Sequence, residues 1–175
     1  RKSEVDFVID ALEISKAIGK PVRVVWTRED DVQHGFYRPA TYNVLKAALD
    51  EHNNPVAWTH RIVGPAVMGA HAAMVGPLKG IDPTSVEGAQ NLPYAVPNLH
   101  VDYVRNEPAV PIGFWRSVGS SQNAFITECF FDELAAAAGK DPYELRRQFL
   151  GKKPRHKAVL ELAATKAGWG QPLPA

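Results

Sequence analysis

The chain has 175 residues, of which 45% are hydrophobic and 22% charged, and its formal net charge is +1. These values are ordinary for a globular domain, and the small net charge gives no reason to expect nucleic acid or an anionic membrane as a partner. The single cysteine excludes an internal disulfide, and the six histidines lack metal-ligand spacing. No apolar run has the length of a membrane span, so we expect neither a metal site nor a membrane-spanning segment in this chain.

The first forty residues predict a helix, a strand and a loop. Apolar residues recur at helical spacing over residues 4–18, and Gly19 followed by a proline ends this pattern. The short β-branched run 21–27 predicts a buried strand. Residues 28–39 are charged and contain a glycine, so we expect a loop there.

The middle of the chain predicts a hairpin and a third strand. Residues 41–49 and 56–63 are the two hairpin strands, and the intervening turn 50–55 is rich in residues that tolerate a left-handed backbone. Residues 64–99 hold many glycines and prolines and little periodicity; a loop of that length is functional, in contact with another subunit, or disordered. The alternation over 99–105 predicts the next strand.

The last third of the chain predicts three helices. The strongest covers residues 121–138 and ends at Gly139. Asp141 is the expected N-cap of the next helix, with Pro142 in its first turn, and Pro154 opens the third. The order of a helix, several strands and then helices predicts an α+β fold, with a mixed or antiparallel sheet, a leading helix and three C-terminal helices.

The most informative stretch is the loop before the strongest helix, where an arginine lies among aromatic, glycine and serine residues. Small residues allow close approach of the backbone to a bound group, and a helix N-terminus offers free N–H groups with partial positive charge. With Arg116 beside it, this end of the helix is a candidate anion cradle. The alternative is a surface loop in which Ser120 or Ser121 caps the helix.

Four segments in order carry a resemblance to a known family: GKPVRVVWTREDD at 19–31, EGAQNLPY at 87–94, PIGFWRSVGSSQNAFITECFFDELAAAAGKDPYELRR at 111–147, and AGWG at 167–170. In these segments the chain resembles the large molybdopterin-binding subunit of molybdenum hydroxylases. It is most similar to the isoquinoline 1-oxidoreductase β-subunit and aldehyde dehydrogenase branch of the xanthine dehydrogenase family.

The resemblance implies a molybdenum-dependent oxidoreductase that hydroxylates an aldehyde or N-heterocycle with oxygen derived from water. It implies a molybdenum–molybdopterin cofactor bound mostly by residues outside this chain, and iron–sulfur clusters on a small partner subunit. Residues 1–175 would then be a single domain, a fragment of the larger subunit, and we expect the isolated fragment to be inactive. The compartment, bacterial cytoplasm or periplasm, stays open.

The resemblance also implies roles for individual residues. Arg116 would border the molybdenum site, where a guanidinium can stabilise developing negative charge. Ser3 falls where purine-oxidising relatives carry a glutamate, which argues against xanthine as the substrate. The same loop would supply cofactor contacts from Gly119, Ser120 and Gln122, and substrate contacts from Trp115 and Ser117.

Other candidate groups favour structural roles. Glu128 and Asp132 share a helix face and could form a catalytic pair of carboxylates, but a solvated or salt-bridged face is the preferred interpretation. His71 lies in the long loop, where it could face substrate or a partner. We expect three residues in the core: Trp26, Trp58 and Cys129. A non-enzymatic α+β domain whose 64–99 loop docks a partner subunit is the competing hypothesis for the whole chain.

Overall fold

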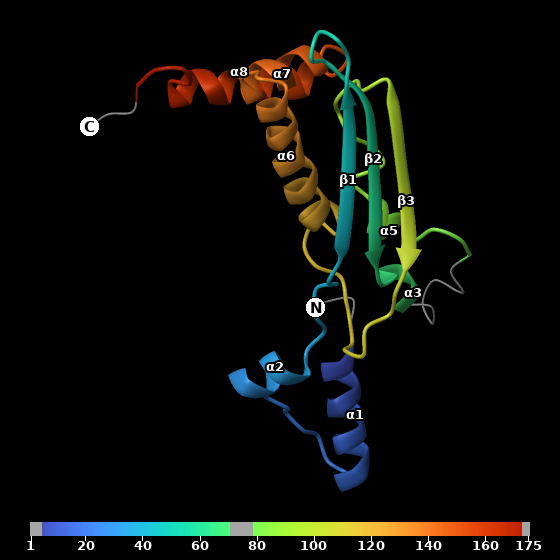
Figure 1. Ribbon diagram of the computed structural model, residues 1–175. Helices are drawn as coiled ribbons and strands as arrows, with labels where there is room; N and C mark the ends of the chain where they lie inside the picture. The colour runs from blue at the N-terminus through green and yellow to red at the C-terminus, as the bar shows by residue number, and fades with distance from the viewer. Residues whose placement is uncertain (1–4, 71–78, 173–175) are drawn as a thin grey trace.

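The computed structural model describes residues 5–70 and 79–172 (Figure 1). Ser3 and His71, singled out from the sequence, lie outside the described residues. No helix in the described ranges is long and apolar enough to cross a membrane. The elements, in chain order, are α1 (Asp6–Ile18), α2 (Arg28–His34), β1 (Tyr42–Leu49), β2 (Pro55–Gly64), α3 (Val67–Ala70), α5 (Pro83–Val86), β3 (Asn98–Arg105), α6 (Gly119–Ala137), α7 (Pro142–Phe149) and α8 (Pro154–Ala167).

Within the described residues, β1, β2 and β3 form one mixed sheet in that order. β1 and β2 pair antiparallel as the expected hairpin, while β2 and β3 run parallel. The Asp50 carboxylate accepts hydrogen bonds from the N–H groups of His52 and Asn54 at 2.9 and 2.8 Å, which closes the turn, and Asn53 adopts a φ of 56°. The predicted α+β class, with its hairpin and third strand, is confirmed.

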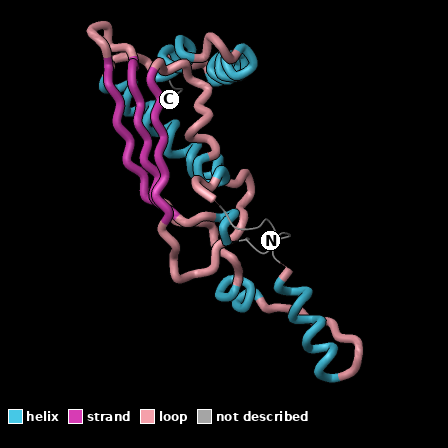
Figure 2. The backbone as a smooth tube through the Cα atoms, turned by 90° about the vertical axis from the view of Figure 1, so that its right-hand side faces the viewer, coloured by secondary structure: helices cyan, strands magenta, loops and turns pink. Residues whose placement is uncertain are grey.

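The main core forms where α6 and the following helices pack on the sheet. Trp58 on β2 is 1% exposed, as expected from the sequence, and lies edge-on to Phe130. Phe131 on α6 is fully buried and stacks on Tyr94, with ring centroids 4.1 Å apart. Figure 2 shows the strands as one layer with α6 running alongside it. The helices expected after the sheet are present as α6, α7 and α8, and Asp141 caps α7 as predicted.

The stretch 64–99 is partly structured rather than one long loop. Its described part contains the short helices α3 and α5. Val86 and Ala89 pack with Ile62 of β2 in a second, smaller cluster of buried apolar side chains. The sequence offered little periodicity here because each helix is a single turn, too short to show a helical repeat.

Two expectations for the first forty residues were wrong. Residues 21–27 are extended but form no strand, because no neighbouring strand within the described residues pairs with them. Residues 28–34 are not a loop but α2, which begins with a capping box: the Thr27 hydroxyl accepts from the Asp30 N–H, and the Asp30 carboxylate accepts from the Thr27 N–H, each at 3.1 Å. The charged residues of this stretch led to the prediction of a loop, although Thr27 and Asp30 have the spacing of a capping box.

The leading helix is present, but its apolar stripe is not buried. None of the α1 residues is buried, and Leu12 is 65% exposed. In Figure 1, α1 and α2 lie beyond the end of the sheet, away from α6 and the main core. A groove of about 760 Å³ separates α1 from the extended segment that contains Trp26, so this tryptophan is only half-buried and not the core residue expected.

The expectation that Cys129 is a core thiol was also wrong. Cys129 is exposed on α6. The helix presents Asn123, Thr127 and Phe131 to the interior, four residues apart, and position 129 lies half a turn away from that face. Apolar neighbours in the sequence therefore did not indicate burial.

Candidate functional site

The loop that carries Arg116 is attached at its start to the segment after α2. The Gly113 N–H donates to the Tyr37 carbonyl, and the Tyr37 N–H donates to the Pro111 carbonyl, both at 3.0 Å. These bonds form a short parallel bridge between Tyr37 and Ile112. Segments more than seventy residues apart in sequence therefore lie side by side directly before Arg116.

The loop then makes a tight turn with a strained backbone. The Val118 N–H donates to the Trp115 carbonyl at 3.0 Å, which folds the chain back around Arg116. Ser117 has a φ of 66° and Val118 has a φ of 46° with a ψ of −127°. Left-handed backbone costs a residue other than glycine about 1–3 kcal/mol and persists only where the surroundings impose it. A β-branched valine is an extreme case.

Helix α6 begins directly after this turn, and neither serine caps it. Val118 is the N-cap residue, and no side chain of the cap accepts a hydrogen bond from the helix. The alternative interpretation, in which Ser120 or Ser121 caps α6, is therefore wrong. Instead the Gly119 N–H donates to the Glu87 Oε2 at 3.2 Å. A carboxylate at a helix N-terminus is favourable because it complements the positive end of the helix dipole.

Glu87 occupies part of the anion-binding position that was predicted at the start of α6. One of the N–H groups expected to face a bound anion is already bonded to a carboxylate of the same chain. The sequence could not reveal this contact, since Glu87 and Gly119 lie 32 residues apart and only the tertiary fold joins them. The only signal was that Glu87 opens one of the resembling segments.

The start of α6 packs against α5 with almost no free space. A Cβ atom on Gly119 would lie 2.1 Å from the Thr84 carbonyl oxygen, so only glycine fits. Asn123, one turn later, is fully buried, and its Nδ2 donates to the carbonyls of Ser85 and Glu87 at 3.0 and 2.9 Å. These contacts lock the helix start onto the α5 segment.

The α5 segment is itself anchored at its N-terminus by a buried aspartate. Asp82 is fully buried and caps α5, accepting from the Thr84 N–H at 2.8 Å and from the Thr84 hydroxyl at 2.6 Å. Its second carboxylate oxygen accepts from the Met68 N–H at 2.9 Å. The Ser85 hydroxyl donates to the Pro65 carbonyl at 3.1 Å. The Arg116 turn thus rests on α6, α6 rests on α5, and α5 is tied to the end of β2.

The structure brings the candidate residues into one continuous turn but leaves its outer side open. Arg116 is exposed and has no hydrogen bond or ion pair with any described residue. Trp115 is 55% exposed, and Ser117 is exposed beside it. The remaining candidates are less accessible: Ser120 and Gln122 are half-buried and Gly119 is buried.

The polar groups of this loop fit a polar, anionic cofactor such as molybdopterin. The Gln122 Oε1 is buried without a hydrogen-bond partner among the described residues, so it is an available acceptor for an N–H donor such as those of a pterin. Arg116 pairs with no described residue, so its guanidinium can interact with a negatively charged oxygen of a bound group. The described residues contain no group of three or more histidine, cysteine or acidic side chains able to hold a metal ion directly.

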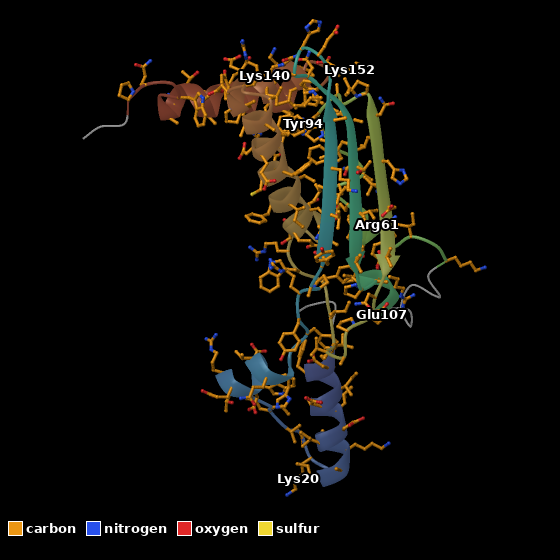
Figure 3. The ribbon with its side chains drawn as sticks, viewed as in Figure 1. Lys20, Arg61, Tyr94, Glu107, Lys140 and Lys152 are labelled. Atoms are coloured by element: carbon orange, nitrogen blue, oxygen red, sulfur yellow. The ribbon has the colours of Figure 1, made fainter. Side chains whose placement is uncertain are left out.

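The other acidic candidates form a structural cluster. Arg146 bonds to the Glu128 Oε2 at 2.9 Å and to the Asp132 Oδ1 at 2.5 Å, and its side chain is 12% exposed. Tyr94, labelled in Figure 3, donates its hydroxyl to Glu128 at 2.8 Å. Burial works against the charged form, but the bonds to Asp132 and Glu128 raise the pKa of Arg146. Burial and the charge of Glu128 likewise raise the pKa of Tyr94.

This Arg146 cluster (Tyr94, Glu128, Asp132 and Arg146) ties α6 to α7. The guanidinium also lies over the Phe131 ring, 5.1 Å from its centroid. Both carboxylates are therefore committed to one arginine, and the salt-bridged interpretation of this helix face is confirmed.

With the fold and loop established, comparison with known proteins decides the family. The model of the molybdopterin cofactor-binding domain matches residues 5–150. The chain belongs to this family. The resemblance inferred from the sequence segments is thus confirmed, and the match includes α1, the sheet, the Arg116 turn, α6 and α7.

Relatives of this molybdopterin cofactor-binding domain include several oxidoreductase subunits. Isoquinoline 1-oxidoreductase subunit beta of Brevundimonas diminuta is 28% identical, over 97% of this chain and 22% of its own length. A probable xanthine dehydrogenase subunit of Bacillus subtilis (strain 168) is 32% identical, over 91% and 21%. The aldehyde oxidoreductase molybdenum-binding subunit of Escherichia coli (strain K12) is 28% identical, over 75% and 17%. The chain thus spans about a fifth of the length of these curated relatives.

Solved structures share the fold. Aldehyde oxidoreductase from Desulfovibrio gigas superposes with a TM-score of 0.57 at 23% identity, covering 77% of this chain and 14% of that one. Quinoline 2-oxidoreductase from Pseudomonas putida 86 gives a TM-score of 0.56 at 22% identity, covering 77% and 17%. At these identities the likeness concerns the fold alone.

Proposed function

We propose that this chain is part of the catalytic subunit of a molybdenum-dependent oxidoreductase that hydroxylates an aldehyde or an N-heterocycle with oxygen derived from water. The observation that carries the proposal is the family match over residues 5–150, which includes a turn presenting an arginine that pairs with no described residue. The names of the relatives, which include aldehyde and isoquinoline oxidoreductases, support this substrate class. When bound, the molybdenum cofactor supplies the two-electron oxidation and the oxygen transfer.

Within this mechanism, Arg116 is the charged residue that this chain contributes. A guanidinium stays protonated at any physiological pH and donates in a fixed geometry, so Arg116 stabilises negative charge that builds on a substrate oxygen. The exposed ring of Trp115 offers a flat apolar surface for a planar aromatic substrate. Ser117 lies at the same turn and supplies a hydroxyl to the substrate. Gln122 would accept a hydrogen bond from the pterin through its buried amide oxygen, with the Ser120 backbone beside it. Gly119 would contribute close packing only, because its N–H already bonds to Glu87.

We further propose that the rest of the enzyme completes this site. The open outer side of the Arg116 turn and the unburied face of α1 need other protein surfaces to exclude water from the reaction. Several relatives are named as subunits, which supports an assembly of more than one chain. A small subunit with iron–sulfur clusters is the proposed electron-accepting partner.

The test of this function is substitution of Arg116 in the complete gene product, co-expressed with its partners. Arg116→Ala should lower kcat/KM by about 10²–10³-fold, the effect of removing one donor that stabilises transition-state charge. The melting temperature and molybdenum content should stay unchanged, because the side chain is exposed and pairs with no described residue. The matched control is Arg155→Ala, which removes an exposed arginine of α8. Unaltered turnover in Arg116→Ala would rule out the assigned role.

The competing function is a non-enzymatic docking domain, and the unburied apolar residues of α1 are the observation in its favour. Metal analysis of the purified complete gene product separates the two. Stoichiometric molybdenum is expected for the enzyme, whereas a product that folds and binds its partner without molybdenum would support the docking domain.

A further inference from the structure

The turn that carries Arg116 needs an external restraint. Ser117 and Val118 are consecutive residues with positive φ, and no glycine occupies either position. Such a conformation relaxes unless neighbouring contacts impose it. The bond from the Val118 N–H to the Trp115 carbonyl closes the turn, but it does not fix how the turn is oriented on the rest of the protein.

A restraint comes from Glu87, the residue that ends α5, and the backbone of Glu87 is itself hydrogen-bonded on both sides. The Glu87 side chain accepts the Gly119 N–H at 3.2 Å, at the first residue after the strained pair. The Glu87 carbonyl accepts from the Asn123 Nδ2 at 2.9 Å, and the Glu87 N–H donates to the Pro83 carbonyl at 3.1 Å. These two bonds hold the Glu87 backbone between α5 and the buried Asn123, so the carboxylate extends toward Gly119 from a fixed point of the chain.

Steric contacts allow little alternative placement. Gly88, with a φ of 84°, lies so close to α6 that a Cβ atom there would be 3.2 Å from the Ser120 Cα. Gly119 would clash with Thr84 if it carried a side chain. The helix start and the residue after Glu87 thus approach backbone to backbone, and the carboxylate lies at their junction.

We infer that Glu87 is a positioning residue for the reaction: its carboxylate holds the Ser117–Gly119 backbone in the strained form that directs Arg116 toward the substrate side of the turn. This inference rests on the proposed function, because it concerns the same arginine. Asn123 supports Glu87 from the buried side and is the second member of the restraint.

The first experiment measures backbone hydrogen exchange of residues 114–120 by mass spectrometry in the complete gene product. Glu87→Ala should speed exchange in this peptide by about fivefold or more, since the Gly119 N–H loses its acceptor and local opening becomes easier. Glu87→Gln keeps an acceptor oxygen and should restore most of the protection. The matched controls are Glu144→Ala and Glu144→Gln, which alter an exposed carboxylate in the first turn of α7. Unchanged exchange in Glu87→Ala would overturn the inference whatever the activity.

The second experiment measures turnover, molybdenum content and melting temperature of the same variants. Glu87→Ala should lower kcat by about tenfold, because a small misplacement of a catalytic group can cost up to about 10²-fold. The Glu144 controls should have the same melting temperature as Glu87→Ala but the full turnover of the parent enzyme. Glu87→Gln should have a kcat within about threefold of the parent value. Faster exchange with unaltered kcat in Glu87→Ala would overturn the positioning role. If Arg116→Ala were also fully active, the proposed function of the turn would fail, while the exchange result would still report the restraint.

Discussion

At the residue scale, the site depends on close approaches that a sequence motif marks only as small residues. Gly119 was predicted to let the backbone approach a bound cofactor, but the space that its side chain would need is filled by the Thr84 carbonyl of the same protein. Its N–H bonds to Glu87 and not to a free ligand position. The glycine is therefore needed for packing of α6 on α5, whatever it contributes to the cofactor.

This packing predicts a large effect of a single methyl group. Gly119→Ala should lower the free energy of unfolding by about 1–3 kcal/mol, because the new Cβ would lie 2.1 Å from a backbone oxygen and must force the two helices apart. Gly151→Ala is the matched control, since the nearest atom to its Cβ would be 3.9 Å away. Urea denaturation of both variants checks the difference. Equal free energies of unfolding for Gly119→Ala and Gly151→Ala would mean that α6 can move away from α5 without destabilising the protein.

At the element scale, β2 places a histidine in the protein interior. His60 is fully buried, its Nε2 lies 2.8 Å from the Asn43 Oδ1 on β1, and its Nδ1 has no partner among the described residues. Burial lowers the pKa of His60 from 6.5 to about 4, against a smaller opposing effect of Asp102. The imidazole is thus neutral near pH 7, and its contact with Asn43 links β2 to β1.

The shifted pKa predicts how stability depends on pH. Between pH 6.5 and 4 the unfolded chain binds a proton at His60 that the folded chain does not, so the free energy of unfolding falls as the pH falls through this range. The loss is on the order of 3 kcal/mol and is complete below pH 4, where His60 is protonated in both states. Urea denaturation at pH 7 and pH 4.5 measures it, and His60→Gln should show a smaller difference than the parent. The control is His52→Gln, which removes an exposed histidine of the turn and should show the same pH difference as the parent. An equally large pH difference in His60→Gln would mean that protonation of His60 does not destabilise the folded protein.

At the scale of the whole molecule, the chain divides into a packed region and an arm with little burial of its own. The sheet with α6 and α7 contains the buried apolar cluster around Phe131 and Leu145. The arm, α1 to α2, has no buried residue in either helix. It lies at one end of the molecule, as Figure 1 shows.

This division predicts a strong contrast between two leucines. Leu145→Ala should cost about 2–5 kcal/mol of unfolding free energy, because the side chain is fully buried. Leu12→Ala should cost less than about 0.5–1 kcal/mol, because this side chain is 65% exposed on α1. Denaturation of the 175-residue chain checks both. A large loss for Leu12→Ala would show that α1 packs on the rest of the chain in solution.

Local signals in the sequence determined much of this protein. The hairpin turn at Asp50, the N-cap Asp141 and the helical repeat of α6 depend on residues within a few positions of each other, and all were predictable. The family was also evident, because four ordered segments carry it along the whole chain. The arginine turn was located for the same reason.

Only the tertiary structure decided which of these elements are buried and what surrounds the turn. The apolar stripe of α1 is regular, yet burial requires a partner surface, and the described chain packs none over it. The extended segment 21–27 has strand composition but no neighbouring strand to bond. Glu87 and Gly119 meet because α5 packs under α6, a contact that joins residues 32 positions apart. Propensity acts along the chain, whereas burial and hydrogen-bond pairing between distant segments depend on the folded arrangement as a whole.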